Sequence, residues 1–379
     1  MLLVVVGWGV VALLSADAGA AGFESAWHGR RVWVGPAYWA NPLQDWRVEG
    51  EEVVAAAARN RTLHRLTHQL ASHPGAFSMK VTVRMDAPQA PLQPKNVWAG
   101  FRFAIRGALE DYRHVLIHPK AFFDAGIRAD GRLVLAGKTG PESGLDPSQP
   151  VELALTVAAD GRATLAGVQA GRRAELSAQL PPAELHGNLA LVAEAPRSRP
   201  QQGNLQPVHW RFRDWRAEGD KIEAHPDQTF GPILWTQYTL SRGVLKLSAQ
   251  FPPIGEADAQ TARLEVRRNG AWQAIATERI HPLARTAVFR IAGWDSTQDT
   301  PYRVVYRWQG RDHAWEGVVR HDPVEKPELV VAAFTGDNGY VFPQTRLVRN
   351  VRLQNPDLLF FSGDQIYESY GGFGIQRSP

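Results

Sequence analysis

Short segments in which apolar and polar residues alternate make up most of the chain. The period of two is clearest at 77–85, 151–157 and 208–215, where one face of an extended strand is apolar and the other is polar. Clusters of Asp, Gly and Arg, as at 129–132, separate such segments and are typical of turns. The pattern predicts that residues 21–224 form a β-sandwich whose sheets each bury one face.

Two similar segments indicate how this sandwich closes. Residues 45–50 have the sequence DWRVEG and residues 214–219 have DWRAEG. Because two copies so far apart are not the period of a repeat protein, we expect them to be the first and last strands of one sheet, lying side by side. The layout resembles the concanavalin-like, laminin-G-type jelly roll. Sandwiches of that kind often bind sugars, so a glycan is an expected partner of this domain.

Tryptophans and two histidines are the candidate binding residues of this domain. The tryptophans are Trp27, Trp33, Trp39, Trp46 and Trp98. They could stack on sugar rings, but we expect most of them in the core. His64 and His68 have the spacing of two metal ligands on a helix, yet no third ligand follows and the segment is equally compatible with a strand, so structural or solvated histidines are expected. Asn60 begins a glycosylation sequon.

Residues 225–322 predict a second β-sandwich. Apolar residues alternate with polar ones at 244–251 and 302–308, and Asn-Gly at 269–270 is a two-residue hairpin turn between two strand-like segments. These strands favour an Ig-like or fibronectin-like domain. The proline-containing segment 322–327 is a short, stiff linker, since each proline fixes φ and keeps the preceding residue extended.

A different pattern begins after the linker. Residues 329–334 and 358–362 are continuous apolar runs, typical of strands buried on both faces of a parallel sheet, and a helix is predicted between them. Residues 323–379 are therefore expected to start an α/β domain with one βαβ unit. Asp337 and Asp364 come directly after the two strands, at the edge where open α/β sheets place their ligands.

The segment GDQIYE at 363–368 resembles the second metal motif of the calcineurin-like metallophosphoesterases. Its Asp-x-x-Tyr form, Asp364 with Tyr367, is the variant shared by purple acid phosphatases and PhoD-like alkaline phosphatases. The segment GPILWTQYTL at 231–240 also resembles the start of the β-domain that precedes the catalytic domain in PhoD-like enzymes. The expected fold is thus mainly β: a jelly roll, an Ig-like sandwich and the first βαβ unit of a metallophosphoesterase domain.

The resemblance implies a dinuclear metal site. Asp364 would bridge the two metals, and Tyr367 would bind one of them, usually iron, as a phenolate; the second would be a divalent cation such as calcium, zinc or manganese. Where Asp-x-His is common in the superfamily, this chain has Asp337-Asn338-Gly339. Asp337 is therefore the third expected ligand and Asn338 a second choice for the same set. A metal-bound hydroxide would attack a phosphate ester substrate.

The N-terminal residues predict export. Residues 2–14 are apolar and are followed by the small residues Ala18-Gly19-Ala20, so residues 1–20 have the pattern of a signal peptide. We expect a secreted, periplasmic or cell-surface protein with no transmembrane segment after signal removal.

Composition narrows the function classes. With 44% hydrophobic residues, 13 Trp, 34 Gly and 26 Pro, the chain of 379 residues is neither disordered nor an all-helical bundle. A net charge of +4 over this length gives no support to nucleic acid as a partner, and the absence of Cys excludes thiol catalysis.

All 12 histidines lie at or before His321, so the later His ligands of the superfamily are missing, and we expect the front part of a longer enzyme, catalytically incomplete as it stands. The alternative is a secreted binding protein for glycans or cell-surface polymers, built on the two β-sandwiches.

Overall fold

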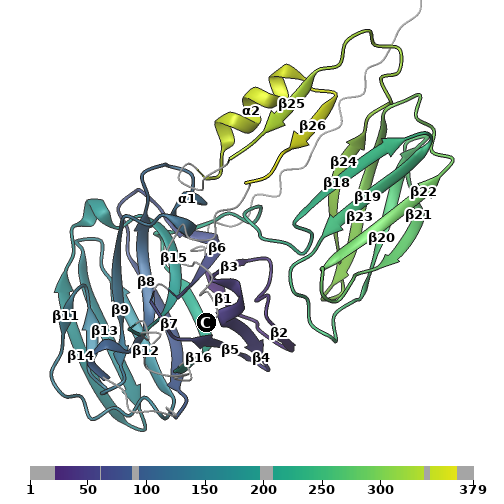
Figure 1. Ribbon diagram of the computed structural model, residues 1–379. Coiled ribbons are helices and arrows are strands. Elements are labelled where there is room, and N and C mark those ends of the chain that lie inside the picture. The colour runs from purple at the N-terminus through teal and green to yellow at the C-terminus, as the bar shows by residue number, and fades with distance from the viewer. Residues whose placement is uncertain (1–21, 60, 88–93, 197–207, 337–341, 365–379) are drawn as a thin grey trace, which may run out of the picture.

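Two β-sandwiches and a small βαβ unit follow one another along the chain in the computed structural model (Figure 1). The structure describes residues 22–59, 61–87, 94–196, 208–336 and 342–364. The mainly β class expected from the alternating pattern is confirmed. Among the helices in these ranges, none has the length and apolarity needed to cross a membrane.

The first sandwich consists of two large antiparallel sheets. In spatial order the first sheet contains β14 (Arg172–Gln179), β13 (Arg162–Gln169), β12 (Val151–Val157), β7 (Phe77–Met85), β16 (His209–Glu218), β5 (Glu52–Ala56), β4 (Trp46–Glu49) and β2 (Arg30–Arg31), with β1 (Phe23–Glu24) paired to β16. The second sheet contains β11 (Lys138–Thr139), β10 (Leu133–Leu135), β9 (Ala121–Arg128), β8 (Trp98–Arg106), β15 (Gly187–Glu194), β6 (Thr62–Leu70) and β17 (Ile222–Ala224), with β3 (Tyr38–Asn41) paired to β6. Four short helical turns connect them: η1 (Leu43–Asp45), η2 (Pro94–Asn96), α1 (His114–Ile117) and η3 (Pro182–Glu184).

One core lies between these two sheets, and the alternating pattern explains it. Along β7 every second residue from Phe77 to Met85 is buried, while the residues between them are only partly covered. Trp46 and Trp215, from the two DWR segments, are both fully buried in this core.

The expected pairing of the two DWR segments is wrong. Strands β4 and β16 belong to the same sheet, but β5 lies between them and pairs with both. The chain turns back directly after β4 through Gly50, whose φ of 66° suits a tight turn, so Glu49 faces Glu52 and the neighbour in sequence takes the place beside β4.

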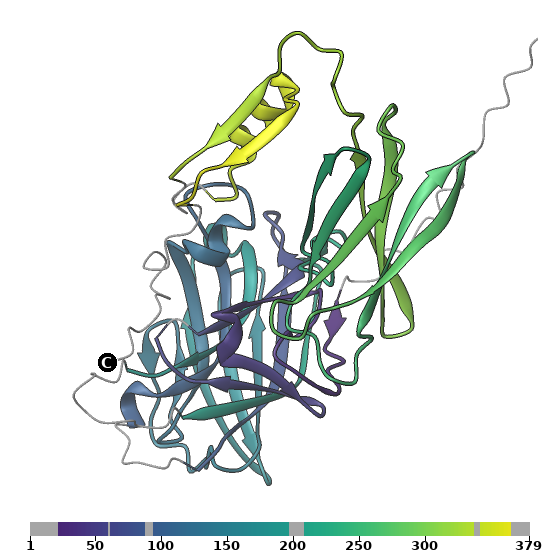
Figure 2. The same cartoon turned by 45° about the vertical axis from the view of Figure 1, so that its right-hand side comes forward.

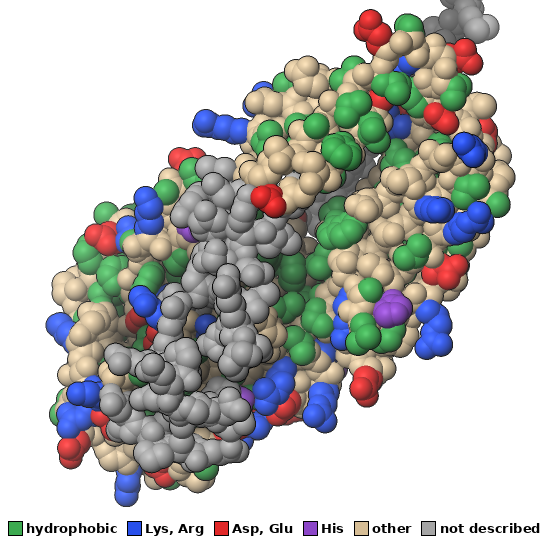
Figure 3. All heavy atoms as spheres, viewed as in Figure 1, with side chains coloured by type: hydrophobic (Ala, Val, Ile, Leu, Met, Phe, Trp, Pro, Cys, Tyr) green, Lys and Arg blue, Asp and Glu red, His purple; other side chains and the backbone are tan. Residues whose placement is uncertain are grey.

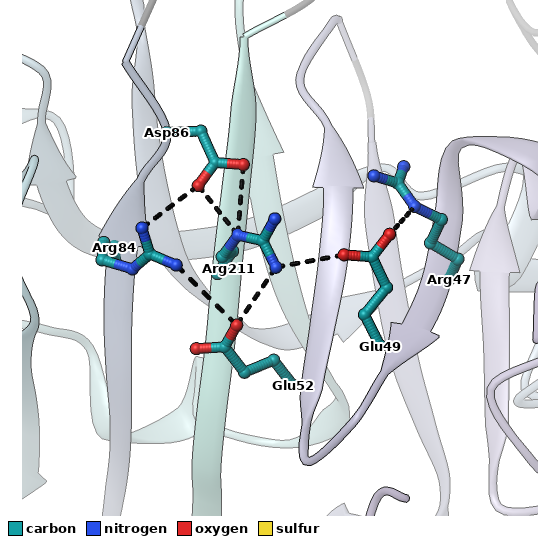
Figure 4. Close-up of polar contacts among 6 residues, drawn as sticks. All are labelled: Arg47, Glu49, Glu52, Arg84, Asp86 and Arg211. Carbon is teal, nitrogen blue, oxygen red and sulfur yellow. Dashed lines mark hydrogen bonds and ion pairs between the residues drawn. The ribbon is translucent and has the colours of Figure 1, made fainter. Parts of the chain in front are cut away.

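A cluster of charged side chains covers the outer face of the first sheet at β4, β5, β7 and β16 (Figure 4). At its centre, the Arg211 guanidinium lies 2.8 Å from Asp86, 3.1 Å from Glu49 and 3.2 Å from Glu52. The three carboxylates raise the pKa of Arg211. Because Arg84 also faces Asp86 and Glu52, positive and negative groups are interleaved across the strands and the cluster is internally neutralised.

The second sandwich has seven strands. Its three-stranded sheet contains β18 (Trp235–Ser241), β19 (Val244–Gln250) and β22 (Thr286–Ala292), and its four-stranded sheet contains β21 (Ala271–Arg279), β20 (Thr261–Arg268), β23 (Thr300–Trp308) and β24 (Arg311–Val319). Asn269 and Gly270 join β20 to β21 with φ values of 50° and 81°, as the predicted two-residue hairpin requires.

The core of the second sandwich includes Trp33, a residue from the chain segment of the first sandwich. Trp33 precedes β3 in the chain, yet its side chain is 1% exposed and belongs to the core of the second sandwich. Its indole nitrogen donates a hydrogen bond to the Phe230 carbonyl at 3.1 Å, and its ring centroid lies 5.1 Å from that of Trp308. The two sandwiches, which lie beside each other in both views (Figures 1 and 2), therefore share a packed interface.

The C-terminal unit has the predicted order of strand, helix and strand. Strands β25 (Val331–Phe334) and β26 (Leu358–Phe361) pair in parallel, and α2 (Thr345–Gln354) connects them and ends at Asn355 in the left-handed conformation. The strands are not buried on both faces, because a single βαβ unit cannot cover both faces of its own sheet: Val331 is 50% and Phe361 is 57% exposed. Figure 3 shows apolar side chains on the surface of this unit.

Removing the Trp33 side chain should destabilise the second sandwich. We expect Trp33→Ala to lower its free energy of unfolding by about 3–5 kcal/mol, because a large buried ring leaves a cavity. Trp235→Ala is the matched control, since Trp235 lies in the same sandwich but is 40% exposed. Urea denaturation followed by circular dichroism measures both. Equal, small effects of the two substitutions would contradict the shared interface.

Candidate functional site

A pocket of about 450 Å³ lies on the outer face of the second sheet, beside α1. This volume is within the range of small-molecule sites. The residues that carry its chemistry are Asn41 of β3, Thr62 and His64 of β6, Arg102 of β8, Lys120, and Phe122 of β9. They come from four strands and one loop that are distant in the sequence.

Helix α1 forms one wall of the pocket because small and apolar residues let it approach the sheet. Val115 packs against Ile105 of β8 and Ala190 of β15, and all three are buried. At Gly107 a Cβ atom would lie only 2.8 Å from the His114 ring, so glycine permits this close packing. The second sheet is therefore buried on both of its faces where α1 covers it.

A chain of hydrogen bonds leads into the pocket. The Trp39 indole donates to the side-chain oxygen Oδ1 of Asn41 at 2.8 Å, and the side-chain amide nitrogen of Asn41 donates to the Leu116 carbonyl and, at 3.4 Å, to the Thr62 hydroxyl. The Thr62 hydroxyl lies 3.1 Å from Nε2 of His64. The Thr62 hydroxyl accepts from Asn41, and Nε2 of His64 is the acceptor within reach of its own proton among the described residues, so we assign that proton to Nε2 and the ring proton of His64 to Nδ1.

His64 is the buried end of this chain. Its side chain is 2% exposed, and Nδ1 has no hydrogen-bond partner among the described residues. Burial, together with the charge of Arg102, lowers the pKa of His64 to about 3, so the ring is neutral at physiological pH. A buried, unpaired N–H group is costly, and it is satisfied when a bound molecule supplies an acceptor.

Arg102 places a buried cation beside His64. Its Nε and Nη2 donate to the two carboxylate oxygens of Asp124 at 2.8 and 3.0 Å, across neighbouring strands of the sheet. The Phe122 ring covers the guanidinium, with its centroid 3.8 Å from Cζ, and is itself 37% exposed. Lys120 is exposed at the rim. The pocket is thus rich in donors, and its aromatic ring is accessible.

The residues expected to bind metal lie elsewhere or outside the described residues. Asp364 lies three residues beyond the end of β26, after Ser362 and Gly363, with a φ of 55°. Asp337, Asn338 and Tyr367 fall outside the described residues. In the parts of the chain that the structure describes, no cluster of three or more His, Cys, Asp or Glu side chains is arranged to hold a metal.

The sequence singled out His64 but missed its surroundings. His64 and His68 both lie on β6, a strand and not a helix, and His68 is half-buried against Phe23 with its ring centroids 5.0 Å apart. Of the five tryptophans, Trp27, Trp33 and Trp46 are buried and Trp39 and Trp98 are half-buried. Asn60 lies outside the described residues. The one local signal for the pocket was a charged residue, Arg102, inside the otherwise apolar segment 98–105.

The buried histidine should make stability depend on pH. Its pKa is about 3 in the folded protein against an ordinary 6.5, so unfolding takes up a proton between these values and stability is lost as the pH falls below 6.5. Between pH 7.5 and 5 we expect His64 to cost about 2 kcal/mol. His64→Gln should remove this part of the loss, whereas His73→Gln, at an exposed position, should not. Urea denaturation at both pH values is the measurement; an unchanged pH dependence in His64→Gln would contradict the burial of a neutral ring.

Comparison with known proteins leaves the chain without an assigned family. No family model matches it, and no curated protein matches it. Among solved structures, it is similar to arcelin-5, a lectin-like defence protein from Phaseolus vulgaris, with 6% identity over 53% of this chain and 99% of that chain and a TM-score of 0.35. It is also similar to the PL-14 alginate lyase from Aplysia kurodai (10% identity, 52% and 97% covered, TM-score 0.34) and to the carbohydrate recognition domain of Emp47p (11% identity, 54% and 98% covered, TM-score 0.33).

Proposed function

We propose that the first sandwich binds a saccharide in the pocket beside α1. The observation that carries this proposal is His64, which is 2% exposed and holds an unpaired Nδ1–H in the pocket wall. The Thr62 hydroxyl, which itself accepts from Asn41, holds the ring in this orientation through Nε2. A side chain that is held in place while one polar group stays unsatisfied is arranged to bind a ligand that offers an acceptor.

The mixture of groups in the pocket suits a sugar. Hydroxyl and ring oxygens of a saccharide accept hydrogen bonds from nitrogen donors, which here come from His64, Arg102 and Lys120. The accessible ring of Phe122 offers an apolar surface for the C–H face of a pyranose. Export by way of the N-terminal apolar segment is part of the same proposal, because it would bring the domain to secreted or cell-surface glycans.

Replacing the imidazole of His64 by a ring that has no nitrogen atoms should weaken saccharide binding. We expect the protein to bind at least one saccharide class on a glycan array, and His64→Phe to lower that affinity about tenfold, the effect of one lost hydrogen bond in a buried site. His68→Phe is the matched control on the same strand, since His68 does not line the pocket. Calorimetric titration of the folded variants measures the affinities. Equal affinities in the two variants would place binding outside this pocket.

The C-terminal unit supports a second, separate proposal: hydrolysis of phosphate esters at a dinuclear metal site. Its support is the parallel pair β25 and β26, with Asp364 three residues beyond the carboxyl end of β26. The proposed ligands are Asp364 with Asp337 and Tyr367, and Asn338 as an alternative. The metals would be iron and a second divalent cation such as calcium, zinc or manganese, which would supply a hydroxide for attack on phosphorus.

Metal content tests this second proposal independently of activity. Asp364→Asn in the intact protein should lower bound metal measured by mass spectrometry, because a neutral amide cannot bridge two cations. Tyr367→Phe should weaken the iron site and abolish any phenolate-to-iron absorption, whereas a merely structural tyrosine would lose only about 0.5–1.5 kcal/mol of stability. Glu328→Gln, at an exposed position of the same unit, should change neither. Unchanged metal content in both ligand variants would rule out the site.

A further inference from the structure

The charged side chains that line the pocket are all cations. They are Arg102 and Lys120; the remaining described lining residues include no Asp or Glu. Asp124, which does not line the pocket, neutralises one of these charges through its paired hydrogen bonds to Arg102. The site therefore keeps about one uncompensated positive charge.

One guanidinium nitrogen of Arg102 is not bonded to Asp124. Asp124 accepts from Nε and Nη2, and Nη1 takes no part in this paired contact. The side chain is 7% exposed and lies under the Phe122 ring, so water screens its charge weakly. The pocket is therefore lined by three nitrogen groups: Nη1 of Arg102, Nδ1–H of His64 and the ammonium of Lys120. Its described lining residues include no carboxylate that would compete for them.

We infer that the saccharide bound beside α1 carries a single negative charge, as a carboxylate or a sulfate ester, next to Arg102, His64 and Lys120. The inference rests on the proposed saccharide binding and specifies its ligand. A monoanion matches the one uncompensated charge, and charge-assisted hydrogen bonds to it are stronger than those to a hydroxyl. A phosphate monoester, with a charge near −2, would leave excess negative charge in a buried site.

Four titrations of the intact protein at low salt test this inference. The ligands are an oligouronate, its carboxyl-reduced neutral form, the neutral form bearing sulfate esters, and sodium acetate or sulfate as the simple anion. We expect at least one charged oligosaccharide to bind about tenfold more tightly than the neutral form, with the difference shrinking at high salt. The carboxylate and sulfate arms identify which anion is preferred. We expect the simple anions to bind more weakly than either charged oligosaccharide.

A charge variant at the rim completes the test. Lys120→Gln should reduce the preference for the charged form over the neutral form about three- to fivefold, because the amide keeps an N–H donor but carries no charge. Lys138→Gln, an exposed position in β11 of the same sheet, is the control. Equal binding of charged and neutral forms, or no effect of Lys120→Gln, would overturn the inference while saccharide binding stands. Binding of none of the oligosaccharides would overturn both, and binding of the simple anion alone would show that the pocket is not a saccharide site.

Discussion

The second sheet of the first sandwich is buried on both faces where α1 covers it, and the pocket depends on this constraint. On one face, Phe101 and Phe103 fill the core; on the other, Arg102 is 6% exposed. A polar group in such a place must be paired inside the protein or face a ligand. Asp124 accepts hydrogen bonds from Nε and Nη2 of Arg102, and the Thr62 hydroxyl is hydrogen-bonded to Nε2 of His64. Arg102 and His64 both line the pocket, where a ligand can bind their remaining nitrogens.

Helix α1 connects this pocket to the C-terminal unit. Leu116 accepts the hydrogen bond from Asn41 on the pocket side, and Nδ1 of His114 lies 3.0 Å from the Phe342 carbonyl, just before α2. Figure 2 shows the βαβ unit next to this part of the first sandwich. The same four-residue helix therefore sets both the shape of the pocket and one contact of the unit that carries Asp364.

Trp33 has a comparable role between the two sandwiches. The core of the second sandwich is built from its own strands, but this ring reaches it from the first, and Arg31 stacks on Trp308 with 5.3 Å between Cζ and the ring centroid. Hydrophobic burial of this kind restricts relative motion more than a polar contact would. The two sandwiches are therefore expected to move as one body, whereas the linker after residue 322 has mostly exposed residues.

The sequence by itself determined the features that depend on neighbours along the chain. Alternation identified β7, β19 and β23, Asn269-Gly270 identified a hairpin, and the two apolar runs identified β25 and β26, because each signal is a local period or turn. Asp364 lies three residues beyond the end of β26, and the metal set of Asp364, Asp337 and Tyr367, with Asn338 as a second choice, stays a prediction.

Only the tertiary structure decided the position of β5 beside β16, the burial of Trp33 in the other sandwich, and the pocket. Asn41, Thr62 and Arg102 are brought together by pairing of β3, β6, β15 and β8, whose order in the sheet differs from their order in the chain. No local period reports such contacts. They arise because strands distant in the sequence bury their apolar faces together, and the polar residues between those faces then become neighbours.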